Sequence, residues 1–154
     1  MTADERAAMQ ALHLRFEQAV PHNRALGLRL LGVEHARSHY VLPYAAHLVG
    51  NPETGVLHGG AISAAMDAAC GAAVFQALPK PMVIATLDLR IDYLKPATPG
   101  RDVTFRAHCY KVTRSVAFVR GVAFHDDEAD PIASGTGSFV LGTRTRQRDP
   151  EERA

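Results

Sequence analysis

A single carboxylate, Asp67, stands in the middle of a long, nearly all-apolar segment that follows the tripeptide His58-Gly59-Gly60. Burying a lone charged acid is costly unless the acid is paired, so its presence needs a reason. A carboxylate can act as a general base or as a nucleophile. Unpaired amides at the start of a helix can stabilise an oxygen that gains negative charge. Together these features indicate acyl-transfer chemistry, in which amides polarise a carbonyl and the carboxylate attacks it or assists the attack.

The segment that holds Asp67 is predicted to be one long helix, over residues 60–78, which the two prolines of "LPKP" end. Because residues three and four apart share a helix face, Gly60, Ser63 and Cys70 lie on the side of Asp67. Small side chains let a narrow ligand or another backbone approach closely. We therefore expect these three residues to contact a substrate.

The spacing between His58 and Asp67 limits how they could cooperate. They are nine residues apart, which is roughly 13 Å along a helix that rises 1.5 Å per residue. Within one chain they are too far apart to act on the same carbonyl. A homodimer with two-fold symmetry would bring the helix start of one subunit against the acid of the other.

The elements around this helix indicate an α+β domain. An amphipathic helix is expected over residues 2–20, ended by Pro21, and a pair of strands lies between residues 25 and 44 with its turn at 36–38. A loop rich in Gly and Pro precedes the long helix, and four strand patterns follow it. We expect an antiparallel sheet that wraps around the helix over residues 21–142, and a polar, flexible tail over residues 143–154.

The first strand after the helix alternates apolar and polar residues with a period of two. Strict alternation places Thr86 on the same face as Asp88 and Arg90. If Thr86 works at a site, that face must line a wet cleft.

Composition excludes several classes of protein. The 154 residues suit one domain, with 47% hydrophobic and 21% charged residues. A net charge of +1 favours neither a nucleic acid nor a membrane surface as partner. The two cysteines, Cys70 and Cys109, are expected to be buried and free, and no pattern of His or Cys indicates a metal site. With no secretion signal or membrane span in the sequence, we expect a cytoplasmic protein.

Three stretches, "NPETGVLHGGAISAAMDAACGAA", "TLDLRIDYLKPA" and "ASGTGSF", resemble the hotdog-fold acyl-CoA thioesterases of the phenylacetic-acid-degradation (PaaI-like) type. The likeness spans residues 21–142. It implies an antiparallel sheet around one central helix, and dimers that join their sheets edge to edge and often pair into tetramers. It also implies active sites at the dimer interface, acyl-CoA as substrate and no cofactor besides the CoA of the substrate.

The resemblance also implies roles for individual residues. Gly59 would offer its backbone N–H to the thioester carbonyl, and His58 would orient the loop or lie beside the thioester. Asn51 would hold substrate or water, Asp67 would act as nucleophile or general base, and Thr86 would place a hydroxyl near the attacking water. Two cations are further candidates for substrate contacts: Arg90 and Lys95.

Other interpretations of the same residues remain open at this point. Asp67 could be a structural acid paired with a buried Arg or with a helix N-terminus across an interface, and His58 could simply bond to backbone. Asn51 could form an Asx turn, and Thr86 could be an ordinary strand residue. The expected activity is hydrolysis of a small aryl or short- to medium-chain acyl-CoA. The alternatives are a non-catalytic acyl-CoA-binding hotdog protein and a hotdog hydratase or dehydratase.

Overall fold

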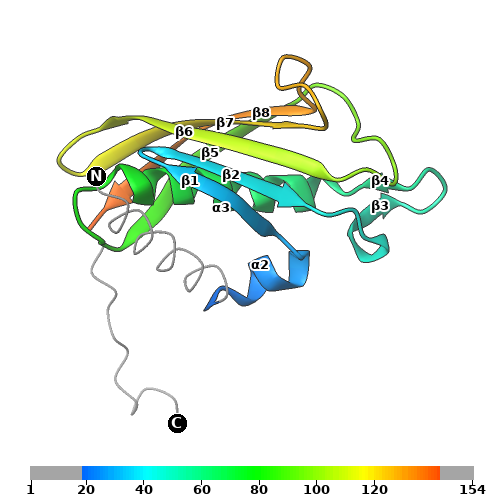
Figure 1. Ribbon diagram of the computed structural model, residues 1–154, viewed down its shortest axis with the longest axis horizontal. Helices are drawn as coiled ribbons and strands as arrows, with labels where there is room; N and C mark the ends of the chain where they lie inside the picture. Colours follow the sequence, from blue (N-terminus) through cyan, green and yellow to red (C-terminus); the bar gives the residue numbers. More distant parts are fainter. Residues whose placement is uncertain (1–18, 143–154) are drawn as a thin grey trace, which may run out of the picture.

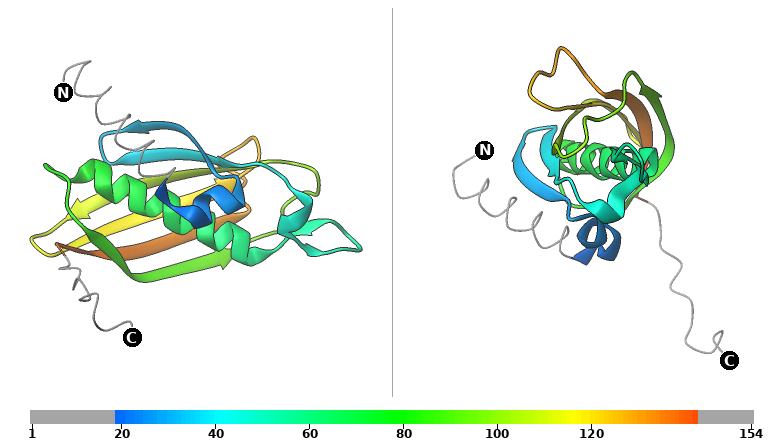
Figure 2. Two further views of the ribbon diagram at one scale, coloured as in Figure 1. Left: turned by 90° about the horizontal axis from the view of Figure 1, so that it is seen from below. Right: turned by 90° about the vertical axis from the view of Figure 1, so that its right-hand side faces the viewer.

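Six antiparallel strands form one sheet that curves around a single long helix (Figures 1 and 2). The computed structural model describes residues 19–142. In spatial order the strands of the sheet are β1 (Arg29–Glu34), β2 (Arg37–Leu42), β6 (Val103–Val112), β7 (Val116–Phe124), β8 (Ala133–Leu141) and β5 (Ile84–Tyr93). The helix is α3 (Gly59–Ala77), which lies against the inner face. The predicted α+β class and the sheet wrapped around one helix are both confirmed.

Helix α3 is enclosed because almost all of its sides are apolar. Ten of its residues are buried, and in the view along the helix the sheet surrounds most of its circumference (Figure 2). Glycines on the sheet make room for its largest buried side chain, since an added Cβ at Gly121 would lie 2.7 Å from Sδ of Met66. A buried hydrogen bond also joins the layers, in which Ser38 Oγ on β2 donates to the Ala69 carbonyl at 2.6 Å.

The length and apolar composition of α3 also match those of a membrane-spanning helix. However, 56% of that stretch is buried inside the protein. Core helices pass the same test of length and composition, so the burial assigns α3 to the core.

The connections contain short elements that the sequence analysis does not predict. The chain forms α2 (Pro21–Leu26), so Pro21 occupies the first turn of a helix, a position where its missing N–H is no loss. The predicted loop before α3 contains η1 (Ala46–Leu48) and a small hairpin, β3 (Val49–Asn51) and β4 (Val56–Leu57). The helix predicted over residues 2–20 and the tail over residues 143–154 lie outside the described residues, apart from 19 and 20.

The alternation predicted for β5 is wrong at one residue, and the error changes the face to which Thr86 belongs. Thr86 pairs with Phe139 and Asp88 with Ser138, so Leu87 is the extra residue of a β-bulge. The bulge turns Thr86 to the inner face, toward α3, and leaves Asp88 and Arg90 on the outer face. Thr86 therefore does not share a cleft with Asp88 and Arg90, contrary to the expectation from strict alternation.

Gly137 on β8 allows β5 to approach closely beside this bulge. An added Cβ would lie 2.7 Å from the backbone oxygen of Asp88. We predict that Gly137→Ala lowers the free energy of unfolding by about 1–3 kcal/mol, because backbone must move to relieve the overlap. Gly32→Ala on β1 is the matched control, since a Cβ there meets nothing within 4 Å. Urea unfolding measures the free energy of unfolding of both variants. Equal values would contradict a close approach of β5 to Gly137.

Candidate active site

The start of α3 presents a backbone amide that has no partner among the described residues. His58 caps the helix: its Nδ1 accepts a hydrogen bond from the Gly60 N–H at 2.8 Å, and its carbonyl accepts from the Ala61 N–H at 3.0 Å. No hydrogen bond to another described residue satisfies the Gly59 N–H. Because this amide lies at the positive end of the helix dipole, it is suited to bind an oxygen that carries negative charge. His58 thus bonds to backbone, as one of the two interpretations of this residue expects.

Tyr93, at the end of β5, holds this helix start in place and was missed in the sequence analysis. Its hydroxyl donates to the Gly59 carbonyl at 2.6 Å and lies 2.5 Å from Ser63 Oγ. An added Cβ at Gly59 would lie 3.4 Å from the Tyr93 ring, so the ring packs directly on that residue. The sequence did contain a signal for this role. Tyr93 falls on the apolar face of the predicted strand, and the hydroxyl of a packed tyrosine usually finds a hydrogen-bond partner.

Asp67 lies two turns further along α3 and is bound by Thr86 on β5. The Thr86 hydroxyl donates to Asp67 Oδ1 at 2.8 Å, across the gap between helix and strand. Among the described residues no Arg or Lys forms an ion pair with Asp67. Its side chain is partly accessible, and its second oxygen, Oδ2, carries no hydrogen bond from the described chain. This oxygen therefore has lone pairs free for an incoming proton or carbonyl.

Cys70 is buried one turn after Asp67 and has no exposed surface. Burial, and then the nearby charge of Asp67, raise the pKa of the Cys70 thiol to about 12. The thiol therefore stays protonated at neutral pH, when it is a poor nucleophile. Cys109 is buried and free as well, as predicted for both cysteines.

Asn51 and the two candidate cations lie apart from Asp67. Asn51 Oδ1 accepts the Glu53 N–H at 3.0 Å, which is the Asx turn considered as the alternative. Arg90 pairs with Asp92 at 2.9 Å on the outer face of the sheet, and Lys95 pairs with Asp130. Within one chain, the structure brings Asp67 together with Thr86 and Cys70, and brings Gly59 together with His58, Gly60, Ser63 and Tyr93.

The free amide and the carboxylate thus form two half-sites on one rigid helix. Gly59 and Asp67 are eight residues apart, which is about 12 Å along the axis. A single carbonyl cannot contact both groups of the same chain.

Among residues 19–142, no group of three His, Cys, Asp or Glu side chains is placed to hold a metal ion.

Comparison with known proteins identifies relatives of the whole domain. A family model described as "Thioesterase superfamily" matches residues 54–132. The "Medium/long-chain acyl-CoA thioesterase YigI" of Salmonella typhimurium is 34% identical over 151 residues, covering 88% of this chain and 96% of the relative. The Escherichia coli protein of the same name matches equally well, at 34% identity over the same coverage.

Solved structures share the fold of this chain. A Pseudomonas aeruginosa crystal structure is 43% identical with a TM-score of 0.78, covering 86% of this chain and 98% of that one. The E. coli PaaI protein from the phenylacetic acid degradation operon has a TM-score of 0.79, covering 90% of this chain and 96% of its own. At 14% identity, the likeness to PaaI shows a shared fold.

The contacts of Tyr93 yield a test of how the helix start is held. We predict that Tyr93→Phe lowers the free energy of unfolding by about 1 kcal/mol or more, because the Gly59 carbonyl and Ser63 hydroxyl lose their partner. The control is Tyr110→Phe, since Tyr110 is half-exposed on the outer face and its hydroxyl bonds to no described residue. Chemical denaturation measures both, and equal stabilities would show that the Tyr93 hydroxyl does not hold the helix start.

Proposed function

This chain belongs to the thioesterase superfamily as a PaaI-like hotdog thioester hydrolase acting on acyl-CoA, and from this premise we propose that its substrates are medium- or long-chain acyl-CoA esters. The products are the carboxylic acid and CoA. The names of the 34%-identical relatives support this acyl class. The observation that carries the proposed mechanism is the free Gly59 amide on the same helix as a carboxylate that Thr86 orients.

The Gly59 amide would bind the thioester carbonyl oxygen. As the carbonyl carbon is attacked, its oxygen gains negative charge, and an N–H donor in a fixed position stabilises that charge more than it stabilises the ground state. His58 and Tyr93 are positioning residues in this scheme. His58 accepts the Gly60 N–H and Tyr93 donates to the Gly59 carbonyl, so both contacts hold the Gly59–Gly60 peptide, which directly follows the amide that donates.

Asp67 would attack the carbonyl carbon through Oδ2 or remove a proton from the water that attacks it. Thr86 donates to Oδ1, so it orients the carboxylate and leaves the other oxygen to react. In both routes the C–S bond breaks, CoA leaves as the thiol, and the acid gains the oxygen of one water. Water is the only co-reactant that this scheme requires.

The separation of the half-sites calls for a second subunit. We propose a two-fold dimer in which the Gly59 amide of one subunit and Asp67 of the other act on one thioester, giving two equivalent sites. The fold offers β5 as the joining edge, because it ends the sheet and has ten residues, against six in the opposite edge strand β1. Long unpaired edges of this kind favour pairing with another chain.

Exposed apolar side chains gather at the same edge. Among the described residues, seven large hydrophobic side chains are exposed, and four of these lie on or beside β5: Val83, Leu87, Tyr93 and Leu94. A cluster of this kind is typical of an interaction surface. A dimer through β5 would cover these side chains and place both half-sites next to the interface. We propose that this dimer acts in the cytoplasm, either alone or paired into a tetramer.

The role of Asp67 can be tested by thiol release from a panel of acyl-CoA esters, from short and aryl groups to long chains. We predict turnover of medium or long chains, and for Asp67→Asn a loss of about two orders of magnitude or more in kcat, as expected when a base or nucleophile is removed. Preference for a small aryl or short acyl group would instead support the acyl class expected from sequence.

Asp88→Asn is the matched control for that experiment. Asp88 lies two residues from Thr86 on the same strand but on the outer face, so the substitution removes a charge away from the half-sites. It should retain wild-type turnover. Circular dichroism and light scattering would show that all three proteins fold and assemble alike. If Asp67→Asn were as fast as wild type, Asp67 would be structural.

The dimer through β5 can be tested with charge at its edge. Leu87 is 58% exposed on β5 and Leu31 is 52% exposed on β1, so Leu87→Lys and Leu31→Lys place the same charge at opposite edges of the sheet. We predict that Leu87→Lys shifts the protein toward monomer in light scattering and lowers thioester turnover in parallel, whereas Leu31→Lys does neither. Dissociation by Leu31→Lys alone would show that β5 is not the joining edge.

A further inference from the structure

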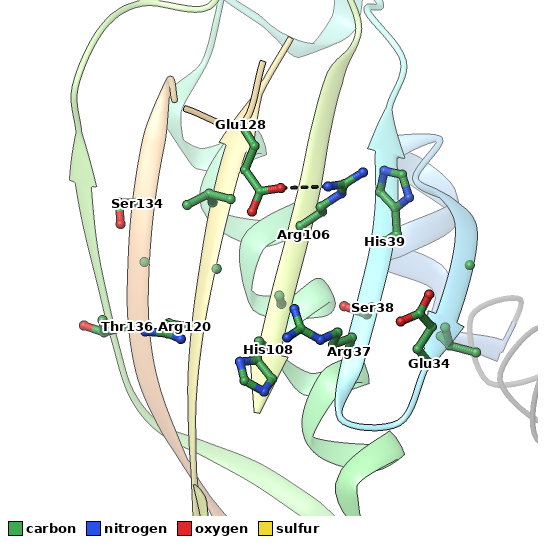
Figure 3. A pocket seen from close by; sticks show the side chains of 16 residues that line it. Glu34, Arg37, Ser38, His39, Arg106, His108, Arg120, Glu128, Ser134 and Thr136 are labelled. Atoms are coloured by element: carbon green, nitrogen blue, oxygen red, sulfur yellow. Dashed lines mark hydrogen bonds and ion pairs between the residues drawn. The ribbon is translucent and has the colours of Figure 1, made fainter. Parts of the chain in front are cut away.

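A polar hollow lies on the outer face of the sheet, on the opposite side from α3 and Asp67 (Figure 3). It has a volume of about 720 Å³ and is lined by residues of β1, β2, β6, β7 and β8, together with Glu128 from the turn before β8. The thioester chemistry proposed above uses none of these side chains. The hollow therefore needs an explanation of its own.

One row of side chains across the hollow is cationic. Strand register places Arg37 on β2 directly opposite His108 on β6, and His108 directly opposite Arg120 on β7. Thr136 on β8 continues the row beside Arg120 (Figure 3). Side chains directly opposite each other on antiparallel strands have Cβ atoms about 5 Å apart. The row therefore places one arginine on each side of a single histidine.

The two arginines of the row form no ion pair with a described residue. In the next row Arg106 pairs with Glu128 at 2.7 Å. In contrast, neither Arg37 nor Arg120 forms an ion pair with any residue in 19–142, although Glu34 lies opposite Arg37 on β1. The Arg120 guanidinium carbon lies 5.7 Å from the centre of the Tyr110 ring, within the range of a cation–π contact.

The state of His108 agrees with this excess of positive charge. Partial burial lowers the pKa of the His108 ring, and Arg37 and Arg120 on either side lower it further. Both arginines therefore contribute positive potential at the histidine. A bound anion would be attracted by both of them.

We propose that the row of Arg37, His108, Arg120 and Thr136 binds the phosphate or diphosphate group of a small molecule. Guanidinium groups match phosphate oxygens with paired N–H donors, and the histidine and the threonine hydroxyl add donors between and beside them. Arg37 and Arg120 are separated by two strand spacings, about 10 Å, so their long side chains can converge on one diphosphate from opposite sides. The phosphates belong either to a free nucleotide or to the nucleotide end of CoA.

Inorganic pyrophosphate tests the site without any thioester. Calorimetric titration of the full chain, at a constant ionic strength of about 0.15 M maintained with sodium chloride, should show saturable binding. Arg37→Gln/Arg120→Gln should weaken that binding about tenfold or more, because two charge-assisted contacts are lost. Arg24→Gln/Arg114→Gln removes the same charge from α2 and from the β6–β7 turn, and should bind as wild type does.

The proposal is overturned if wild type shows no saturable binding at millimolar pyrophosphate, as would occur if a second copy of the chain covered this face. It is also overturned if both double variants bind equally well. An NMR titration of the His108 ring in wild type supplies a readout that needs no variant, since its resonances should shift in parallel with binding. Because these two binding measurements require no turnover, their results are independent of the proposed function.

Kinetics then identify the source of the phosphates. If the site holds the nucleotide end of CoA, Arg37→Gln/Arg120→Gln should raise KM about tenfold for acyl-CoA and leave KM unchanged for the same acyl group on pantetheine. If the site holds a free nucleotide, both KM values should be unchanged and ADP should compete with pyrophosphate. Either pattern supports the site. Competition by neither CoA nor ADP would overturn the assignment to nucleotide phosphates.

Discussion

The burial of α3 on nearly every side is the constraint on which the rest of this structure depends. A helix that is apolar all round has to be enclosed, and one curved sheet achieves this only if its inner face offers small residues where the helix approaches most closely. The same enclosure gives Asp67 and the Gly59 amide fixed positions relative to the sheet. A rigid helix then holds the two groups about 12 Å apart, too far to meet on one carbonyl.

Strand β5 supplies a hydrogen-bonding side chain to each half-site. Its bulge at Leu87 turns the Thr86 hydroxyl onto Asp67, and its last residue, Tyr93, reaches the carbonyl of Gly59. One strand therefore contacts both reactive positions on the helix. Because β5 is also the sheet edge with the most exposed apolar side chains, the proposed dimer would form beside the residues that orient the chemistry.

The two faces of the sheet differ in their electrostatics. The inner face contacts a helix whose one carboxylate is partnered by a hydroxyl. The outer face carries ion pairs such as Arg106 with Glu128, but also the row of Arg37, His108 and Arg120, whose arginines form no ion pair among the described residues. An arginine without an ion-pair partner has N–H donors available to a ligand, which is the basis for proposing a site on this face.

Local patterns in the sequence were sufficient to predict the helix over 60–78, the hairpin before it, the four strands after it and the family. Each of these depends on periodicity, prolines or a contiguous motif, all of which are encoded within a few neighbouring residues. They also predicted that the helix start and Asp67 lie too far apart to act together within one chain, because helical rise follows from residue number alone. In contrast, the face of Thr86, the role of Tyr93 and the cationic row could not be predicted. The position of the bulge depends on how β5 pairs with β8. The hydrogen-bond partner of the Tyr93 hydroxyl depends on which residue the fold brings next to it. The row of charges depends on the register of β2, β6 and β7. These relations join segments far apart in the chain, so they exist only once the sheet has closed around α3.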